Sequence, residues 1–149
     1  MTDAQAVTRP RRWAALAALA ALVVSGLLVV AFAPGDTAGS DIAGDALYAA
    51  AVYAAVVIIA PRLRPWAVAA IAVGWCIAVE LFQLTGIPLA AGAAFPPAKL
   101  VLGTVFDPRD LAVYVMTVAV ACAIDAVIGA VARGHIGRAG SDGRGIRAP

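Results

Sequence analysis

Long apolar runs separated by short polar segments dominate the chain. Stretches with few or no charged residues cover 13–33, 46–60, 66–85 and 110–132, and prolines, glycines and charged residues fill the segments between them. A helix of about 20 apolar residues crosses the roughly 30 Å hydrocarbon core of a bilayer. The stretches lack the apolar–polar alternation of membrane β-strands. The pattern therefore predicts an all-α membrane protein, a bundle of four transmembrane helices.

The flanking segments are polar. We expect residues 1–12 to form a cytoplasmic N-terminal segment, 13–132 the transmembrane domain, and 133–149, which is rich in Gly and Arg, a disordered cytoplasmic tail. The Ala-Phe-Ala triplet at 31–33 resembles a signal-peptide cleavage site. The preceding apolar run exceeds the about 7–15 residues of a signal-peptide core, so the first span is expected to remain as an anchor.

The distribution of basic residues predicts the orientation. With both termini in the cytoplasm, the 11 lysines and arginines all lie inside except Lys99 and Arg109. The opposite orientation would reverse this ratio, against the positive-inside rule. We therefore expect a multi-pass membrane protein with the N- and C-termini inside.

Composition supports the membrane class and excludes others. Of the 149 residues, 63% are hydrophobic and 13% are charged, whereas soluble domains are about 45–50% apolar and about 25% charged. The net charge of +2 reflects the cytoplasmic arginines and does not predict a nucleic-acid partner. The two cysteines have no metal-ligand spacing, and the single histidine lies in the tail. We expect no cofactor and no metal.

A small set of polar residues converges on the predicted outer side of the bundle. An ionisable group in a span costs about 2.5–3.5 kcal/mol on insertion scales and suggests a functional site. Glu80 and Gln83 lie one turn apart near the outer end of the third span, and the other groups open the second and fourth spans or lie in the outer loop. The candidate polar cluster consists of Asp45, Tyr48, Tyr53, Glu80, Gln83, Lys99, Asp107, Arg109, Asp110 and Tyr114.

Structural roles compete with a binding role for these groups. Asp45 and Asp107 are suited to cap the second and fourth helices, because carboxylates favour helix N-termini. Glu80 could instead be held by Arg109 or Lys99 as an ion pair. Near the inner end, Asp125 is expected to pair with Arg133, which lies about two turns further along the same helix.

Three motifs in one order resemble domain-of-unknown-function family 2809, a family of small bacterial integral membrane proteins. They are GDALYAAAVY at 44–53, VELFQL at 79–84 and KLVLGTVFDPRDLAVY at 99–114. The resemblance covers about residues 40–130. It implies the same membrane architecture and no established activity.

More distantly, the chain resembles the VanZ-like membrane proteins, some of which are linked to glycopeptide resistance. The shared positions are Asp45, Tyr53, Glu80, Gln83, Asp107, Asp110 and Tyr114. The chain departs from that pattern in the loop before the last motif, where Ala93–Phe95 replace an expected arginine and Lys99 replaces a histidine, and at Thr117, which replaces a glycine.

We therefore expect a non-enzymatic or weakly enzymatic protein of the cell envelope whose outer cluster binds a lipid head group or a cell-wall precursor. One alternative is a structural subunit that contacts a partner membrane protein or a second copy of the chain. A small transporter is a further alternative, although the sequence has no inverted repeat and no continuous polar stripe.

The orientation can be tested with a topology reporter. A periplasm-dependent reporter fused after Arg133 is expected to be inactive, because an even number of spans returns the chain to the side on which it began. Activity of that fusion, with full expression, would contradict the bundle with both termini inside.

Overall fold

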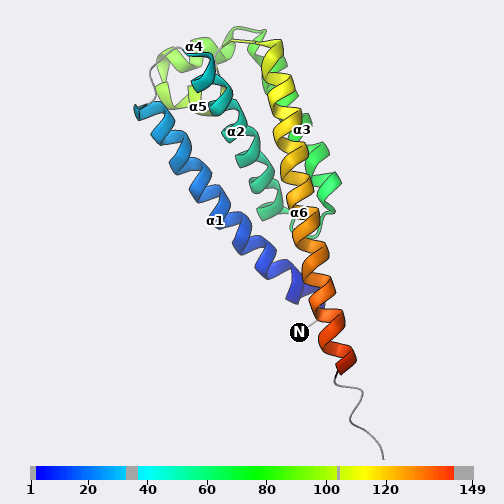
Figure 1. Cartoon of the computed structure of the whole chain (residues 1–149). Coiled ribbons are helices and arrows are strands. Elements are labelled where there is room, and N and C mark those ends of the chain that lie inside the picture. The colour runs from blue at the N-terminus through cyan, green and yellow to red at the C-terminus, as the bar shows by residue number, and fades with distance from the viewer. Residues whose placement is uncertain (1–2, 33–36, 104, 143–149) are drawn as a thin grey trace, which may run out of the picture.

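The computed structural model describes residues 3–32, 37–103 and 105–142, and the side chains within them except those of 3–7, 38 and 133–142. Long helices lie side by side, and short helices cover the end of the bundle away from the N-terminus (Figure 1). No strand occurs in the described ranges. The elements are α1 (Asp3–Phe32), α2 (Ala38–Ile59), α3 (Pro65–Gln83), α4 (Ile87–Ala94), the 3-10 turn η1 (Pro96–Ala98), α5 (Lys99–Leu102) and α6 (Pro108–Asp142).

Four helices are long and apolar enough to cross a membrane. The apolar stretches run over Thr8–Phe32, Gly39–Ile59, Pro65–Gln83 and Pro108–Ala132. Large apolar side chains cover their outer faces, as at Val24, which is 55% exposed, and Ile128, which is 61% exposed. Such outward apolar surface suits lipid rather than water. The predicted all-α bundle with four spans is confirmed.

Local chemistry explains where the second and third helices begin and end. Thr37 caps α2, because its side chain accepts a hydrogen bond from the Ser40 N–H at 3.3 Å. Asp45 therefore lies two turns inside α2, and the expectation that it caps this helix is wrong. The helix ends before Pro61, which has no N–H to continue it, and Pro65 begins α3 at the first helical position.

The segment between α3 and α6 is more ordered than an irregular loop. Gly86, at φ 71°, separates α3 from α4, and Gly103, at φ 64°, ends α5. Asp107 caps α6 as expected, since its Oδ1 accepts a hydrogen bond from the Arg109 N–H at 2.8 Å. At the other end, α6 continues to Asp142. The tail that is expected to be disordered from 133 onward thus begins within this helix, and its residues 143–149 lie outside the described residues.

The core is a set of i, i+4 stripes of mostly small side chains. The helix α2 packs against α1, α3 and α6, and α3 packs against α6. Small residues let the backbones approach closely, which stabilises a bundle where lipid removes the hydrophobic drive for association. The buried stripes are Ala49, Tyr53 and Val57 on α2, Val68, Ala72 and Cys76 on α3, and Tyr114 and Val118 on α6.

One ionic contact fastens α1 to the rest of the bundle near the N-terminus. The Arg11 guanidinium donates to both carboxylate oxygens of Asp125, at 3.0 and 2.5 Å, and to the carbonyls of Pro61 and Leu63, both at 2.7 Å. The Tyr53 hydroxyl donates to Asp125 at 2.9 Å. The expected partner of Asp125 was Arg133, whose side chain lies outside the described residues. The structure pairs Asp125 with Arg11, which is distant in sequence and near only after α1 folds back along α2.

Removing the ion pair between Arg11 and Asp125 should destabilise the bundle. We expect Arg11→Gln to lower the free energy of unfolding by about 2–3 kcal/mol, because it leaves a half-buried carboxylate without its charged donor. Steric trapping in detergent micelles measures this free energy. The control is Arg62→Gln on the exposed α2–α3 turn, for which we expect a change within about 0.5 kcal/mol. Equal effects of the two variants would contradict the assigned role of Arg11.

Candidate functional site

The Glu80 carboxylate is completely buried near the end of α3, with an exposed fraction of 0%. Its Oε1 accepts a hydrogen bond from the Tyr114 hydroxyl at 2.9 Å, and its Oε2 accepts one from the Asp107 N–H at 3.4 Å. Both donors come from α6 or the residue that caps it. A carboxylate without partners at this depth would cost several kcal/mol, so these contacts fix the start of α6 against α3.

The Tyr114 hydroxyl brings a third helix to the same place. It lies 3.4 Å from Oδ1 of Asp45 on α2, and the Asp110 side chain lies beside that of Asp45. A phenol has a single proton to donate, so the shorter contact to Glu80 is the stronger one. Carboxylates this close repel one another unless a proton or a cation lies between them. The helices α2, α3 and α6 therefore meet at an acidic cluster.

Gln83, one turn after Glu80, joins α3 to the end of α5. Its Nε2 donates to the Leu102 carbonyl at 3.0 Å. The φ of Gly103, 64°, favours glycine, and a Cβ added to it would lie 2.3 Å from Gln83 Nε2, so the Gln83 side chain would have to shift. The Gln83 side chain is 7% exposed, and its Oε1 has no hydrogen-bond partner among the described residues. Gln83 therefore has an acceptor that the described part of the protein leaves unused.

Tyr48 lines the same region from α2. Its ring packs against that of Tyr114 at a centroid distance of 6.2 Å and an interplanar angle of 57°, a tilted geometry that aromatic pairs favour. Its hydroxyl accepts a hydrogen bond from the indole N–H of Trp75 at 3.0 Å. Since that contact uses the oxygen as an acceptor, the Tyr48 proton is available to a ligand.

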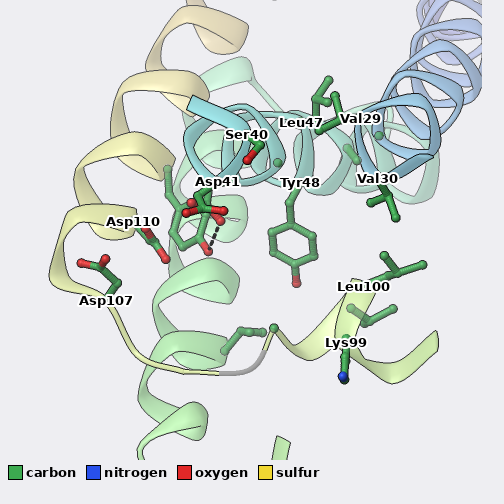
Figure 2. Close-up of a pocket in the computed structure, with 18 of the residues that line it drawn as sticks. Val29, Val30, Ser40, Asp41, Leu47, Tyr48, Lys99, Leu100, Asp107 and Asp110 are labelled. Carbon is green, nitrogen blue, oxygen red and sulfur yellow. Dashed lines mark hydrogen bonds between the residues drawn. The ribbon is translucent and has the colours of Figure 1, made fainter. Parts of the chain in front are cut away.

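The two cations of the region do not neutralise the buried carboxylate. Arg109 lies 3.8 Å from Asp107 and 3.9 Å from Asp110, too far for good hydrogen bonds, and its side chain is 42% exposed. Figure 2 shows the Lys99 amine pointing away from Asp107 and Asp110. The described residues contain no ion pair from Glu80 to either cation, so the expected Glu80–Arg109 or Glu80–Lys99 pair is wrong. The buried tyrosine and a backbone N–H hold this carboxylate instead.

A cavity of about 770 Å³ opens beside the cluster. Figure 2 shows Val29, Val30 and Leu100 on one side of it, Asp107 and Asp110 on the other, and Tyr48 between them. One wall is therefore apolar and the facing wall is polar. The apolar wall includes Leu22, Val23, Gly26, Leu27, Val29 and Val30 of α1, and the polar wall includes Ser40, Asp41, Asp45, Glu80, Gln83, Asp107, Arg109, Asp110 and Tyr114.

The structure brings together most of the sequence candidates but not all of them. Tyr53 does not reach the cluster, because its hydroxyl donates a hydrogen bond to Asp125 near the opposite end of the bundle. Reasoning from sequence missed Ser40 and Asp41, although the acidic segment before the second span contained a signal. It also missed the whole α1 wall, for which an unbroken apolar run gives no signal. Nor do the described residues group three His, Cys, Asp or Glu side chains so as to hold a metal ion.

Comparison with known proteins identifies a family but no function. The family described as "Protein of unknown function (DUF2809)" matches residues 35–118, more than half of the chain. That range includes α2, α3, the short helices and the beginning of α6, and so most of the polar wall. No curated protein and no solved structure matches the chain significantly.

The contact between Tyr114 and Glu80 should contribute measurably to stability. We expect Tyr114→Phe to lower the free energy of unfolding by about 1–3 kcal/mol, because a buried carboxylate oxygen loses its donor. Tyr48→Phe removes the same atom from a neighbouring ring whose hydroxyl only accepts from an exposed indole, and it should change the free energy by less than about 0.5 kcal/mol. Steric trapping compares the two, and indistinguishable values would show that the buried hydrogen bond does not hold the helices together.

Proposed function

The chain belongs to the DUF2809 family, whose function is unknown, and we propose that it is a membrane protein that binds the polar head of a lipid or lipid-linked cell-wall precursor. The proposal rests on one observation above the others, the cavity of about 770 Å³ with an apolar wall from α1 and a facing polar wall. A volume of this size lies within the usual range of about 300–1,000 Å³ for small-molecule sites.

The two walls suit a molecule that is itself amphiphilic. The α1 side offers aliphatic carbons, against which an acyl or prenyl chain can pack. The opposite side offers hydrogen-bonding groups from three helices, which a polar head requires when it leaves water. A purely apolar ligand would leave the free acceptors of Gln83 and Asp110 without a partner, and a small polar solute would leave the α1 wall uncovered. An amphiphile at the membrane surface satisfies both.

We also propose that this end of the bundle faces outward from a bacterial plasma membrane. Both described helix ends on the other side, the start of α1 and the continuation of α6 beyond its apolar stretch, lie away from the short helices (Figure 1). The arginines of the N-terminal segment and of the α2–α3 turn belong to that side, which the positive-inside rule assigns to the cytoplasm. The resemblance to VanZ-like proteins is in keeping with such an envelope role.

A cavity-filling substitution tests the proposal directly. A Cβ added at Gly26 on the α1 wall, or at Gly74 on α3, meets no atom within 4 Å. Gly26 lines the cavity, whereas Gly74 does not. We therefore expect Gly26→Phe to occupy the cavity and Gly74→Phe to add an aromatic ring elsewhere on a helix, without a clash at Cβ in either case.

Binding is measured by native mass spectrometry of detergent-solubilised protein with phosphatidylethanolamine, phosphatidylglycerol or a lipid-linked peptidoglycan precursor. We expect at least one of these to stay bound to the wild type and to Gly74→Phe, and to bind about tenfold or more weakly to Gly26→Phe. If none binds the wild type, or if the two variants bind alike, a ligand-free structural or partner-binding role is supported instead.

A further inference from the structure

The polar wall of the cavity offers acceptors of hydrogen bonds in excess of donors. Carboxylates line it at Asp41, Asp45, Glu80, Asp107 and Asp110. Two buried oxygens there, Oε1 of Gln83 and Oδ1 of Asp110, have no hydrogen-bond partner among the described residues. Since Gln83 is 7% exposed, its free acceptor is a second indication of a ligand, independent of the acidic side chains. A head group that donates hydrogen bonds and carries positive charge complements this wall.

Lys99 and Arg109 are the cations among the residues that line the cavity. Arg109 lies at the edge of the acidic wall, whereas the Lys99 amine points away from Asp107 and Asp110 (Figure 2). Arg109 is the second residue of α6, and its guanidinium lies 3.8 Å from the Asp107 carboxylate and 3.9 Å from that of Asp110. The Arg109 side chain is 42% exposed, so its N–H donors are free to bind an anion outside the acidic cluster. Guanidinium groups bind phosphate oxygens well, often through two parallel hydrogen bonds. The wall therefore offers acidic groups and, next to them, one phosphate-binding group.

The apolar wall is open to the lipid. Leu27 and Val30 of α1, and Leu100 and Val101 of α5, line the cavity and are all more than half exposed. Within the described residues, α1 packs along α2, and its packing against α5 is slight at most. An acyl chain can therefore lie between α1 and α5 while its head group reaches the polar wall, so that a lipid has no need to leave the bilayer.

We propose that the ligand is a zwitterionic aminophospholipid. Its primary ammonium lies at the acceptors of Asp45, Gln83 and Asp110, its phosphodiester contacts Arg109, and an acyl chain runs between α1 and α5. This inference rests on the proposed function, because it names the lipid class for the same cavity. A primary ammonium supplies three donors and a positive charge, which are what the acidic wall lacks.

Lipids with identical acyl chains and different head groups separate this proposal from general lipid binding. Dioleoyl phosphatidylethanolamine has a primary ammonium, dioleoyl phosphatidylcholine has a quaternary ammonium without donors, and dioleoyl phosphatidylglycerol has hydroxyls and no cation. A dioleoyl diglucosylglycerol provides hydroxyl donors without charge. We expect the first to bind about tenfold or more tightly than each of the others in a competition measured by native mass spectrometry. Glycerophosphoethanolamine, which lacks acyl chains, should not compete at equal concentration.

Substitutions locate the preference on particular side chains. Asp110→Asn should reduce the advantage of phosphatidylethanolamine over phosphatidylcholine by about tenfold, as expected when one charge-assisted hydrogen bond is lost. Arg109→Gln should weaken all three phospholipids together, because they share the phosphodiester, and leave the glycolipid unchanged. The matched control Arg62→Gln, on the exposed α2–α3 turn, should affect none of them.

Each other outcome overturns the inference in a recognisable way. Tighter binding of the glycolipid or phosphatidylglycerol would keep a head-group site but reject an ammonium ligand. Equal binding of all four lipids would show that the head group is not recognised. A second variant, Asp45→Asn, is measured beside Asp110→Asn. A preference for phosphatidylethanolamine that survives both substitutions would place the ammonium elsewhere. Binding of the lipid-linked peptidoglycan precursor but of none of these lipids would reject the inference alone, and absence of binding by the precursor as well would reject the proposed function itself.

Discussion

The hydrogen bond from the Tyr114 hydroxyl to the buried Glu80 carboxylate is the contact on which this end of the bundle depends. In lipid, Glu80 cannot turn toward water, so its oxygens must find donors inside the protein. The donors are Tyr114 and the backbone of Asp107, the cap of α6. One side chain thereby fixes both where α6 begins and how it faces α3. The same hydroxyl approaches Asp45, which extends the constraint to α2.

A second polar contact, at the opposite end, explains why the cavity exists. Arg11 ties α1 to α6 and to the α2–α3 turn, and α1 otherwise packs along α2. At its other end, near the short helices, α1 makes no ion pair or side-chain hydrogen bond to α3, α5 or α6 among the described residues. The first helix is thus held firmly at one end and stands beside the acidic cluster at the other. The space left between them has one apolar and one polar wall.

Long apolar runs were sufficient to predict the four spans, because a continuous run of this length is typical of a membrane helix. They also drew attention to Glu80, Gln83, Asp110 and Tyr114, since polar groups are costly where they lie. Long-range pairing could not be predicted. Asp125 and Arg11 are 114 residues apart, and nothing in their local sequence indicates that α1 passes α6. The α1 wall was invisible for a related reason: its side chains look the same whether they face lipid or a cavity.

Solid-state NMR of the protein in bilayers tests the central claim most directly. The sample carries ¹⁵N in the amine of phosphatidylethanolamine and ¹³C in the aspartate and glutamate carboxyl groups. A ligand held by the acidic wall predicts nitrogen–carbon dipolar contacts at ion-pair separations, about 4–5 Å, that are lost in Gly26→Phe and retained in Gly74→Phe. Absence of such contacts in the wild type, or their persistence in Gly26→Phe, would contradict the account.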